Sequence, residues 1–317
     1  MAAENNISGF AGQANFADRL AAAILNKQSQ VCVGLDPRLE EMPPFLVEKY
    51  RDSGTAGCGR KEVAACFEEF GAAIIDAVAP HAVALKLQLA CFEQYGPPGF
   101  KAFRHLVRRA AAAGLIVIAD AKRGDIGVSA AAYAASYLGS PAGLEGGVTG
   151  LEIDAMTVNP LFGTDGLEPF LTGCADSGKG IFILVKTSNP GSADLQDLEL
   201  ASGLLWHEHL AGLVKEWGAG LVGDSGYSSA GAVVGATHPG AVARLRSMMP
   251  GVFFLLPGFG AQGATAADIA AAFDREGLGG LAAASRSIIY AGKGPDFAKA
   301  AATAAAAMKA DLWKIVS

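Results

Sequence analysis

The chain has 317 residues, of which 51% are hydrophobic and 18% are charged, and its formal net charge at pH 7 is −6. This size and composition suit one large α/β domain or two ordinary ones with a substantial buried core. The acidic balance and the lack of a long basic run argue against nucleic acid or an anionic membrane as a partner, and no apolar run approaches the ~20 residues that span a bilayer.

Apolar periodicity predicts helices and strands in nearly strict alternation along the chain. The predicted helices are, in chain order, 16–27, 45–51, 63–78, 100–113, 129–138, 167–171, 200–217, 241–249, 266–273 and 296–308. The predicted strands are 31–36, 82–88, 115–119, one within 151–160, 181–186, 232–236, 252–256 and 281–284. A proline-containing, charge-mixed stretch at about 37–62 reads as an insertion, and the stretches 54–59 and 223–231 read as loops.

Eight strands that alternate with helices predict a closed (β/α)8 TIM barrel, here as a single domain with an additional N-terminal helix. A doubly wound open sheet is the second possibility. No G-x-G-x-x-G follows the first predicted strand, which argues against a dinucleotide-binding fold.

The cysteines give no sign of a metal knuckle or a disulfide framework. Cys32, Cys58, Cys66, Cys91 and Cys174 are odd in number and form no C-x-x-C pair. The first ten residues lack the basic and apolar regions of a secretory signal. We therefore expect a cytoplasmic protein with reduced thiols.

Charged residues follow three consecutive predicted strands, and in a (β/α)8 barrel the carboxyl ends of all strands meet at one face. The first strand ends in Asp36, the second carries Lys86, and the third is followed by Asp120, Lys122 and Asp125. Desolvated charges are tolerated when they are paired, so a structural ion pair is one interpretation of this pattern, and an edge lysine that reaches solvent is another for Lys86 alone. The complete set instead favours a reactive mouth.

Two further turns carry groups suited to a ligand. The predicted fifth strand ends in the hydrogen-bonding turn 186–191, which is also ordinary turn chemistry. The glycine-rich turn 257–263 contains Gln262, and Arg286 follows the eighth strand, where barrels commonly bind phosphate. No histidine is predicted at this face, so neither a metal site nor a Ser-His-Asp triad is expected.

With these residues in place, the chain resembles the orotidine 5′-phosphate decarboxylase family, in its longer bacterial branch. The central motif is Asp120-Ala121-Lys122-Arg123-Gly124-Asp125-Ile126-Gly127. Further matching segments are, in order, 32–37, 85–88, 157–160, 185–192, 234–237, 256–258, 260–263 and 285–286.

The resemblance implies decarboxylation of orotidine 5′-phosphate to uridine 5′-phosphate in pyrimidine biosynthesis, without metal or cofactor. It implies that Lys122 protonates C6 of the pyrimidine and that Asp120 lies beside the substrate carboxylate. Lys86 would bridge the acids and the ribose, and Asp36 would bind a ribose hydroxyl. In the homodimer of the family, Asp125 would reach into the neighbouring subunit's site.

The resemblance also implies a set of substrate-binding residues. Ser188 matches the residue that reads the pyrimidine edge, and Gln262 and Arg286 match the phosphate grip. Ser129, where many relatives have threonine, would lie close to Asp125. The matching motifs place Asn159, Pro257 and Ser285 in the binding site as well.

Three other functions remain open on the residues alone. A sugar-phosphate synthase or related lyase would share D-x-K-x-x-D but would usually recruit magnesium. An aldolase would form a Schiff base on Lys86 or Lys186. A barrel that only binds a nucleotide would not need Lys122 for turnover.

Overall fold

The computed structural model describes residues 14–51, 59–260 and 263–316. Eight parallel strands close into a barrel in the order β1-β10-β9-β8-β7-β6-β3-β2. They are β1 (Val31–Leu35), β2 (Ala84–Gln88), β3 (Ile116–Arg123), β6 (Ala155–Val158), β7 (Gly180–Lys186), β8 (Ser228–Val234), β9 (Val252–Pro257) and β10 (Gly280–Ala284). The predicted (β/α)8 barrel is confirmed, and the open-sheet alternative is wrong.

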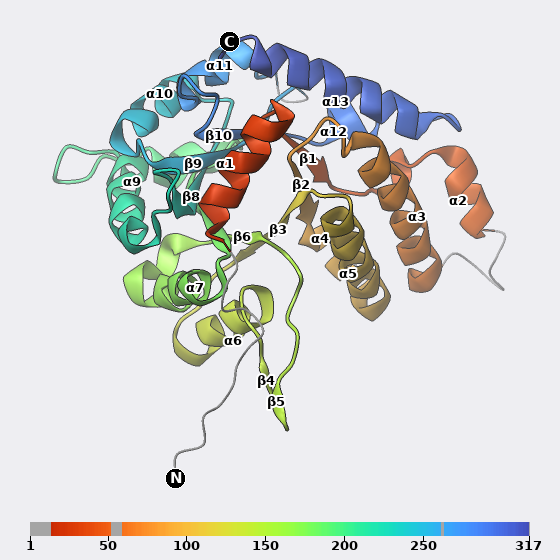
Figure 1. The fold of residues 1–317 in the computed structure, drawn as a ribbon, viewed down its shortest axis with the longest axis horizontal. Helices are drawn as coiled ribbons and strands as arrows, with labels where there is room; N and C mark the ends of the chain where they lie inside the picture. The colour runs from red at the N-terminus through yellow and green to blue at the C-terminus, as the bar shows by residue number, and fades with distance from the viewer. Residues whose placement is uncertain (1–13, 52–58, 261–262, 317) are drawn as a thin grey trace.

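Helices surround this barrel (Figure 1). The longer ones are α1 (Phe16–Lys27), α2 (Pro44–Arg51), α3 (Arg60–Val78), α5 (Gly96–Ala112), α6 (Gly127–Tyr137), α7 (Gly163–Ser177), α9 (Trp206–Trp217), α10 (Pro239–Met248) and α13 (Phe297–Trp313). The short ones are α4 (Leu89–Glu93), α8 (Ala193–Gln196), α11 (Ala266–Ile269) and α12 (Arg286–Ile289). Single 3-10 turns are η1 (Leu39–Glu41), η2 (Pro160–Phe162), η3 (Pro190–Ser192), η4 (Ala219–Leu221) and η5 (Ala270–Ala272).

The predicted strand that differs most from the structure is β8. We expected a loop over 223–231 and a strand over 232–236, but β8 already begins at Ser228. Serine, alanine and glycine have weak strand preferences, so the sequence hides this strand. Tertiary packing requires the small residues: a Cβ on Gly231 would lie 2.6 Å from the ring of Phe182 on the neighbouring strand.

Other differences are local. The helix expected over 200–217 begins only at Trp206, because a turn with Gly203 at φ +80° precedes it and Glu208 accepts a hydrogen bond from the Leu205 backbone N–H. Within 151–160 only Ala155–Val158 forms a strand. The hairpin of β4 (Ala142–Gly143) and β5 (Gly146–Gly147), which extends away from the barrel, was not predicted.

One end of the barrel is closed by α1. The apolar face of α1, including Phe16, Leu20 and Ile24, belongs to a buried cluster with inward-facing strand residues such as Phe182. The rings of Phe16 and Phe182 pack edge to face with centroids 5.9 Å apart. A Cβ on Gly180 would lie 2.2 Å from the Phe16 ring, so glycine at this position lets α1 dock. This closed end is called the floor below.

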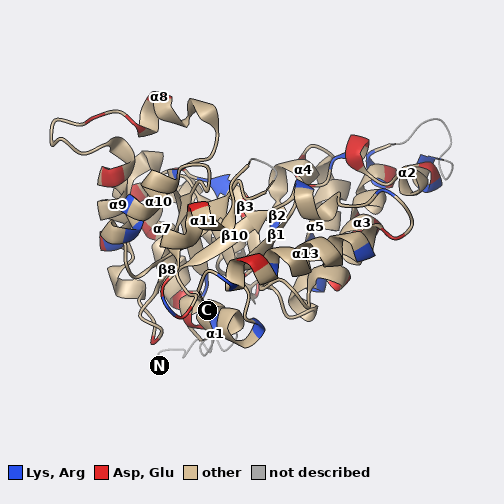
Figure 2. Ribbon diagram, turned by 90° about the horizontal axis from the view of Figure 1, so that it is seen from above, with Lys and Arg blue, Asp and Glu red and all other residues tan. Residues whose placement is uncertain are grey.

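Figure 2 shows α8 and α1 on opposite sides of the barrel. The segments that follow the carboxyl ends of the strands, including α4 and α8, therefore lie around the open end, called the mouth below. In the part of the chain that the structure describes, no helix combines the length and apolar character needed to cross a lipid bilayer.

Candidate active site

A cavity of about 610 Å³ opens at the mouth. Side chains from the carboxyl ends of most barrel strands line it. Among the residues predicted for the site, the lining contains Asp36, Lys86, Asp120, Lys122, Ser188, Pro257, Ser285 and Arg286. The barrel interpretation predicted that the charges at the ends of the first three strands share one mouth. This is confirmed for Asp36, Lys86, Asp120 and Lys122.

These four charged side chains form one connected network. Lys86 Nζ donates to Asp120 Oδ2 at 2.7 Å and lies 3.6 Å from Asp36 Oδ1. Lys122 Nζ donates to the other carboxylate oxygen of Asp120, Oδ1, at 2.6 Å. Asp120 is thus held between two ammonium groups, and charge alternates along the network from acid to amine to acid to amine.

Burial differs sharply between the two lysines. The side chain of Lys86 is 6% exposed and that of Asp120 is 9% exposed, whereas the Lys122 side chain is 47% exposed. Lys86 is therefore an interior member of the network that keeps Asp120 in place. Lys122 is the member whose ammonium a molecule in the cavity can reach.

The protonation states follow from the balance between burial and pairing. Burial alone would lower the pKa of Lys86, but the carboxylates of Asp120 and Asp36 outweigh it, and its pKa lies above the ordinary value. Burial alone would raise the pKa of Asp120, but Lys86 and Lys122 outweigh it, and its pKa lies well below the usual range. Asp120 and Lys86 therefore both stay charged at neutral pH.

Asp36 has an unused acceptor. Its Oδ1 is buried and has no hydrogen-bond partner among the described residues, apart from the ion pair with Lys86. Its backbone is held by Tyr290, whose hydroxyl donates to the Asp36 carbonyl oxygen at 3.2 Å and accepts from the Arg38 N–H at 2.8 Å. An oxygen of this kind can accept a hydrogen bond from a hydroxyl of a ligand in the cavity.

The side of the cavity formed by later strands is mainly apolar. Leu184, Val233, Leu255 and Ala283 line it from β7, β8, β9 and β10. The cavity therefore offers a charged side and an apolar side, which fits a ligand that has both a polar edge and a flat, weakly polar face.

A further cation, Arg286, follows the end of β10. It is exposed and lines the cavity beside Ser285, and its guanidinium makes no hydrogen bond or ion pair with any residue that the structure describes. Ser285 comes close to β1, since a Cβ on Gly34 would lie 1.9 Å from its Oγ. Gln262, predicted as the second phosphate ligand, lies outside the described residues.

The turn that carries Ser188 is tied to the barrel from behind. Lys186 Nζ, on a side chain only 3% exposed, donates to Asp197 Oδ1 at 2.6 Å. Gln196 Oε1 accepts from the Thr187 N–H at 2.8 Å. Both contacts hold the excursion from β7 to α9 against the carboxyl end of β7. Because Lys186 is absent from the cavity lining, the aldolase alternative loses one of its two candidate lysines.

Three predicted site residues do not line the cavity of their own subunit. Asp125 accepts a hydrogen bond from the Ile126 N–H at 2.8 Å, and Ser129 is exposed on α6. Asn159 Oδ1 accepts from the Leu161 N–H at 3.0 Å and so caps η2. The cavity lining therefore brings together four of the five predicted charges, and the role predicted for Asp125 stays a prediction. The predicted substrate-binding role of Asn159 also stays a prediction, since only its Oδ1 is used in this local contact.

Other lining residues were not given a role from the sequence. Thr157 Oγ1 donates to Asp120 Oδ1 at 2.9 Å, and Gln88 Nε2 donates to Asp120 Oδ2 at 3.2 Å. Both lie within segments that match the family, and this match was the only indication in the sequence that they belong to the site. Their role arises from their positions on the two strands next to β3. Gln88, for example, pairs with Asp120 in the register of β2 and β3.

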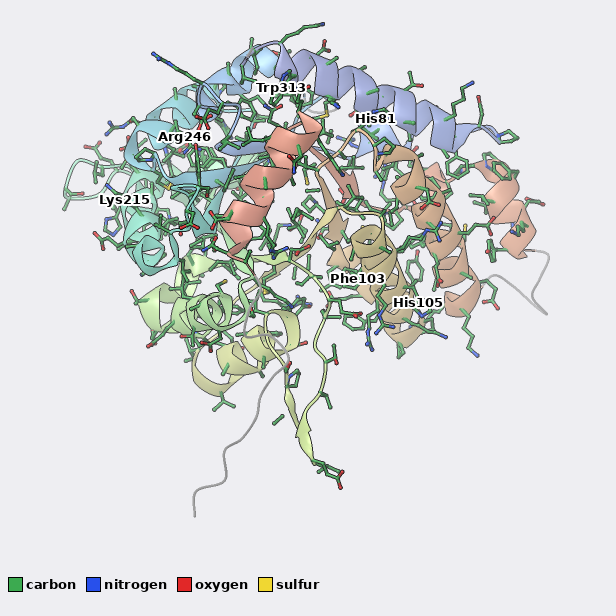
Figure 3. The ribbon with its side chains drawn as sticks, in the orientation of Figure 1. His81, Phe103, His105, Lys215, Arg246 and Trp313 are labelled. Atoms are coloured by element: carbon green, nitrogen blue, oxygen red, sulfur yellow. The ribbon has the colours of Figure 1, made fainter. Side chains whose placement is uncertain are left out.

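No histidine lines the cavity, but His238, which follows β8, does lie at the mouth, with its Nε2 3.1 Å from the carbonyl oxygen of Thr187. His105, on α5, is paired with Glu68 (Figure 3). His207 is buried, and its Nδ1 lies 3.2 Å from Asp197 Oδ1. Within residues 14–51, 59–260 and 263–316, no three His, Cys, Asp or Glu side chains are grouped so that they could hold a metal ion.

Comparison with known proteins gives a consistent result. The sequence model of the orotidine 5′-phosphate decarboxylase / HUMPS family matches residues 29–302. The chain belongs to this family. An orotidine 5′-phosphate decarboxylase of Rhodopirellula baltica is 46% identical over 290 residues, which cover 90% of this chain and 92% of that protein.

Solved structures of the family share the fold. The OMP decarboxylase of Leishmania donovani is 32% identical, with a TM-score of 0.69 over 93% of this chain and 99% of that chain. The UMP synthase of Leishmania donovani is 33% identical, with a TM-score of 0.71, and the match covers 94% of this chain but 57% of that longer one.

Proposed function

We propose that this member of the family decarboxylates orotidine 5′-phosphate (OMP) to uridine 5′-phosphate (UMP), the step that completes this nucleotide in pyrimidine biosynthesis. The observation that carries the proposal is the Asp36–Lys86–Asp120–Lys122 network, which presents one exposed ammonium, Lys122, beside a buried carboxylate that stays ionised. Curated relatives named as decarboxylases at 34–46% identity support the same activity.

In this reaction the bond between C6 and the carboxylate carbon breaks and carbon dioxide leaves. The electron pair remains on C6, in the plane of the pyrimidine, where no conjugated group can accept it. Lys122 first stabilises this charge as an ammonium and then transfers a proton from Nζ to C6. The products are carbon dioxide, UMP and a neutral Lys122, which takes a proton from solvent before the next turnover.

The stabilisation from Lys122 alone is not sufficient. At ~4 Å and an effective dielectric constant near 20, one cation stabilises a unit negative charge by about 4 kcal/mol. Enzymes lower barriers by roughly 8–23 kcal/mol. We assign the remainder to the preorganised network, which needs no rearrangement as charge develops, and to binding of the phosphate and ribose. Repulsion between Asp120 and the substrate carboxylate is a further contribution.

The remaining cavity residues suit the other parts of OMP. The buried, unpartnered Oδ1 of Asp36 is available to a ribose hydroxyl, and Lys86 lies next to it. Ser188 lines the cavity on the turn after β7 and is our candidate for the pyrimidine edge. Arg286, with a guanidinium that makes no contact among the described residues, is our candidate for the phosphate, together with Gln262, Ser285 and Pro257 of the same two loops.

We also propose that the active form is a homodimer in which Asp125, with Ser129 nearby, completes the neighbouring subunit's site. Asp125 does not line the cavity of its own chain, and its Oδ1 accepts a hydrogen bond from the Ile126 N–H. Apolar side chains close to it are exposed in the single subunit: Ile126 is 55%, Val128 88%, Leu161 68% and Phe162 45% exposed. An exposed apolar cluster of this kind is typical of a surface that another chain covers.

Subunit mixing tests the dimer. Lys122→Ala and Asp125→Ala homodimers should each be inactive, whereas a mixture of the two should regain activity, because one site of the heterodimer contains both native residues. Mixtures that stay as inactive as the separate variants would contradict a shared site. The cytoplasmic location stays a prediction that rests on the odd number of cysteines and the lack of a C-x-x-C pair in the sequence.

A decarboxylation assay tests the proposed function itself. Purified protein without added metal should release carbon dioxide from OMP and change its ultraviolet spectrum, and EDTA should not affect the rate. A magnesium-dependent sugar-phosphate synthase, the first alternative left open by the sequence, would lose activity in EDTA and leave OMP unchanged. Borohydride should trap no substrate adduct, which separates the decarboxylase from an aldolase that uses Lys86. A barrel that only binds nucleotides would bind OMP without releasing carbon dioxide.

A further inference from the structure

The strand that carries Asp120 and Lys122 is irregular at these residues. Ala119 of β3 pairs with Met156 of β6, but Arg123 pairs with Val158, so β3 has two more residues than β6 across this interval. Thr157 is the one residue of β6 that faces this bulge. Bulges interrupt the regular ladder of backbone hydrogen bonds and redirect side chains, and they are common beside active sites.

Lys122 occupies a backbone conformation that is rare for residues with a side chain. Its φ is +49°, in the left-handed region, and Gln28 is the only other non-glycine residue with a positive φ in the described ranges. Such a conformation persists where surrounding contacts impose it. The contact available here is made by Thr157: the Lys122 N–H donates to Thr157 Oγ1 at 2.9 Å.

The same hydroxyl also contacts the carboxylate that Lys122 pairs with. Thr157 Oγ1 lies 2.9 Å from Asp120 Oδ1, the oxygen that accepts from Lys122 Nζ at 2.6 Å. A backbone N–H can only donate, so the hydroxyl accepts from Lys122 and its single proton goes to Asp120. Thr157 is 1% exposed, which removes competing water from both bonds.

We infer that Thr157 is a positioning residue for catalysis: its hydroxyl holds the Lys122 backbone in the left-handed conformation and fixes the Asp120 carboxylate that orients the Lys122 ammonium. The inference rests on the proposed decarboxylation for its kinetic consequences. A closed ring runs from the Lys122 N–H through the Thr157 hydroxyl and Asp120 Oδ1 to Lys122 Nζ. Thr157 on the neighbouring strand therefore holds the Lys122 backbone directly and the Lys122 ammonium through Asp120.

The decisive variant is Thr157→Val, which keeps the shape of the side chain and removes the hydroxyl. Displacement of a reacting group by about 1 Å can lower a rate by about 100-fold. We expect kcat for OMP to fall by about 10- to 100-fold with little change in KM, because Thr157 positions the proton donor and does not bind substrate. Exchange of the C6 hydrogen of UMP with deuterated water should fall by the same factor, because it uses the same lysine proton.

Two variants serve as controls. Thr157→Ser keeps the hydroxyl and should retain most of the activity. Ser177→Ala removes a buried hydroxyl on α7 that donates to the Gly173 carbonyl, and it should leave kcat unchanged. If the valine variant does not fold, Thr157→Ala provides the same two measurements without the added methyl group.

A crystal structure of the hydroxyl-free variant gives a readout that does not depend on activity. A Lys122 φ that returns to negative values, or a Lys122 Nζ that leaves Asp120, supports the inference. It is overturned if Lys122 keeps φ near +49° and its contact with Asp120, or if kcat stays within about threefold of wild type. If the wild-type chain releases no carbon dioxide from OMP, the proposed function fails, and the crystal structure alone decides the positioning role.

Discussion

Two buried lysines at opposite ends of the barrel show how differently this fold treats charge. At the mouth, Lys86 lies between Asp120 and Asp36. At the floor, Lys179 precedes β7 and donates to the carbonyl oxygens of Tyr137 and Leu151 at 3.2 and 3.0 Å. Burial is the largest influence on both, but carboxylates raise the pKa of Lys86, whereas the pKa of Lys179 falls to about 8.

This difference separates a reactive end from a supporting end. At the mouth, Lys86 and Asp120 are kept ionised by their pairing, and the side chain of Lys122 is left accessible. At the floor, cations serve as hydrogen-bond donors that join strand ends: Arg246 donates to carbonyl oxygens at the starts of β9 and β10 and stacks on Phe254 at 3.8 Å (Figure 3). Substitutions at the mouth should therefore lower turnover, and also stability where they break a buried ion pair, whereas substitutions at the floor should affect stability alone.

The largest expected difference is between Lys122→Ala and Lys179→Met. Loss of about 4 kcal/mol of charge stabilisation corresponds to a fall in kcat of about 1000-fold for Lys122→Ala, and loss of the proton donor adds to it. Lys179→Met should leave kcat within about twofold of wild type, because it alters only the floor. Steady-state kinetics on OMP measure both, and comparable losses in the two variants would break the separation of the two ends.

The second test compares the stability of Lys86→Met and Lys179→Met. Removing Lys86 leaves Asp36 without its cation and Asp120 with one fewer, which should lower the free energy of unfolding by about 3–5 kcal/mol. Removing Lys179 takes a hydrogen-bond donor from the carbonyl oxygens of Tyr137 and Leu151, and the loss should be smaller, about 1–3 kcal/mol. Urea unfolding at pH 7 measures both values. An equal loss of unfolding free energy in the two variants would mean that pairing with carboxylates does not distinguish the lysine at the mouth from the one at the floor.

The third test uses an arginine from each end. Arg286→Gln should lower kcat/KM for OMP by about 10- to 100-fold, the effect of losing charge-assisted hydrogen bonds to a phosphate, and should leave Tm unchanged. Arg246→Gln should leave kcat/KM unchanged and lower the free energy of unfolding by about 1–3 kcal/mol, because buried carbonyl oxygens lose their donor. Kinetics and thermal melts of both variants should show this crossed pattern.

The smallest effect is a pH dependence of stability from Lys179. Its pKa is about 8 in the folded chain and 10.5 in the reference state, so between these values the unfolded chain binds more protons. Stability should therefore rise with pH in this window, by up to about 1.4 kcal/mol per pH unit. Lys179→Met should lack this contribution, and identical pH slopes of unfolding for the two proteins would contradict it. Lys86 has the opposite sign, since its stabilising effect is lost only as pH rises through its raised pKa.

The local pattern of the sequence was enough to predict the barrel and most of its mouth. Apolar runs with the periods of strands and helices gave the alternation, and strand ends in a parallel barrel share one face by necessity. Asp36, Lys86, Asp120 and Lys122 could therefore be brought together without coordinates. The prediction for β8 was less accurate because the small residues at 228–231 carry no apolar signal of their own. The predicted start of α9 was too early because a turn with Gly203 at positive φ precedes the helix.

What the sequence determined alone is which charges follow which strands, since this depends only on residue order and period. The tertiary structure decided how they touch. The contact between Thr157 and Asp120 joins residues 37 positions apart, and it exists because β3 bulges against β6 at this point. The register of the strands and the positive φ of Lys122 both arise from packing between strands distant in sequence, which no local pattern encodes.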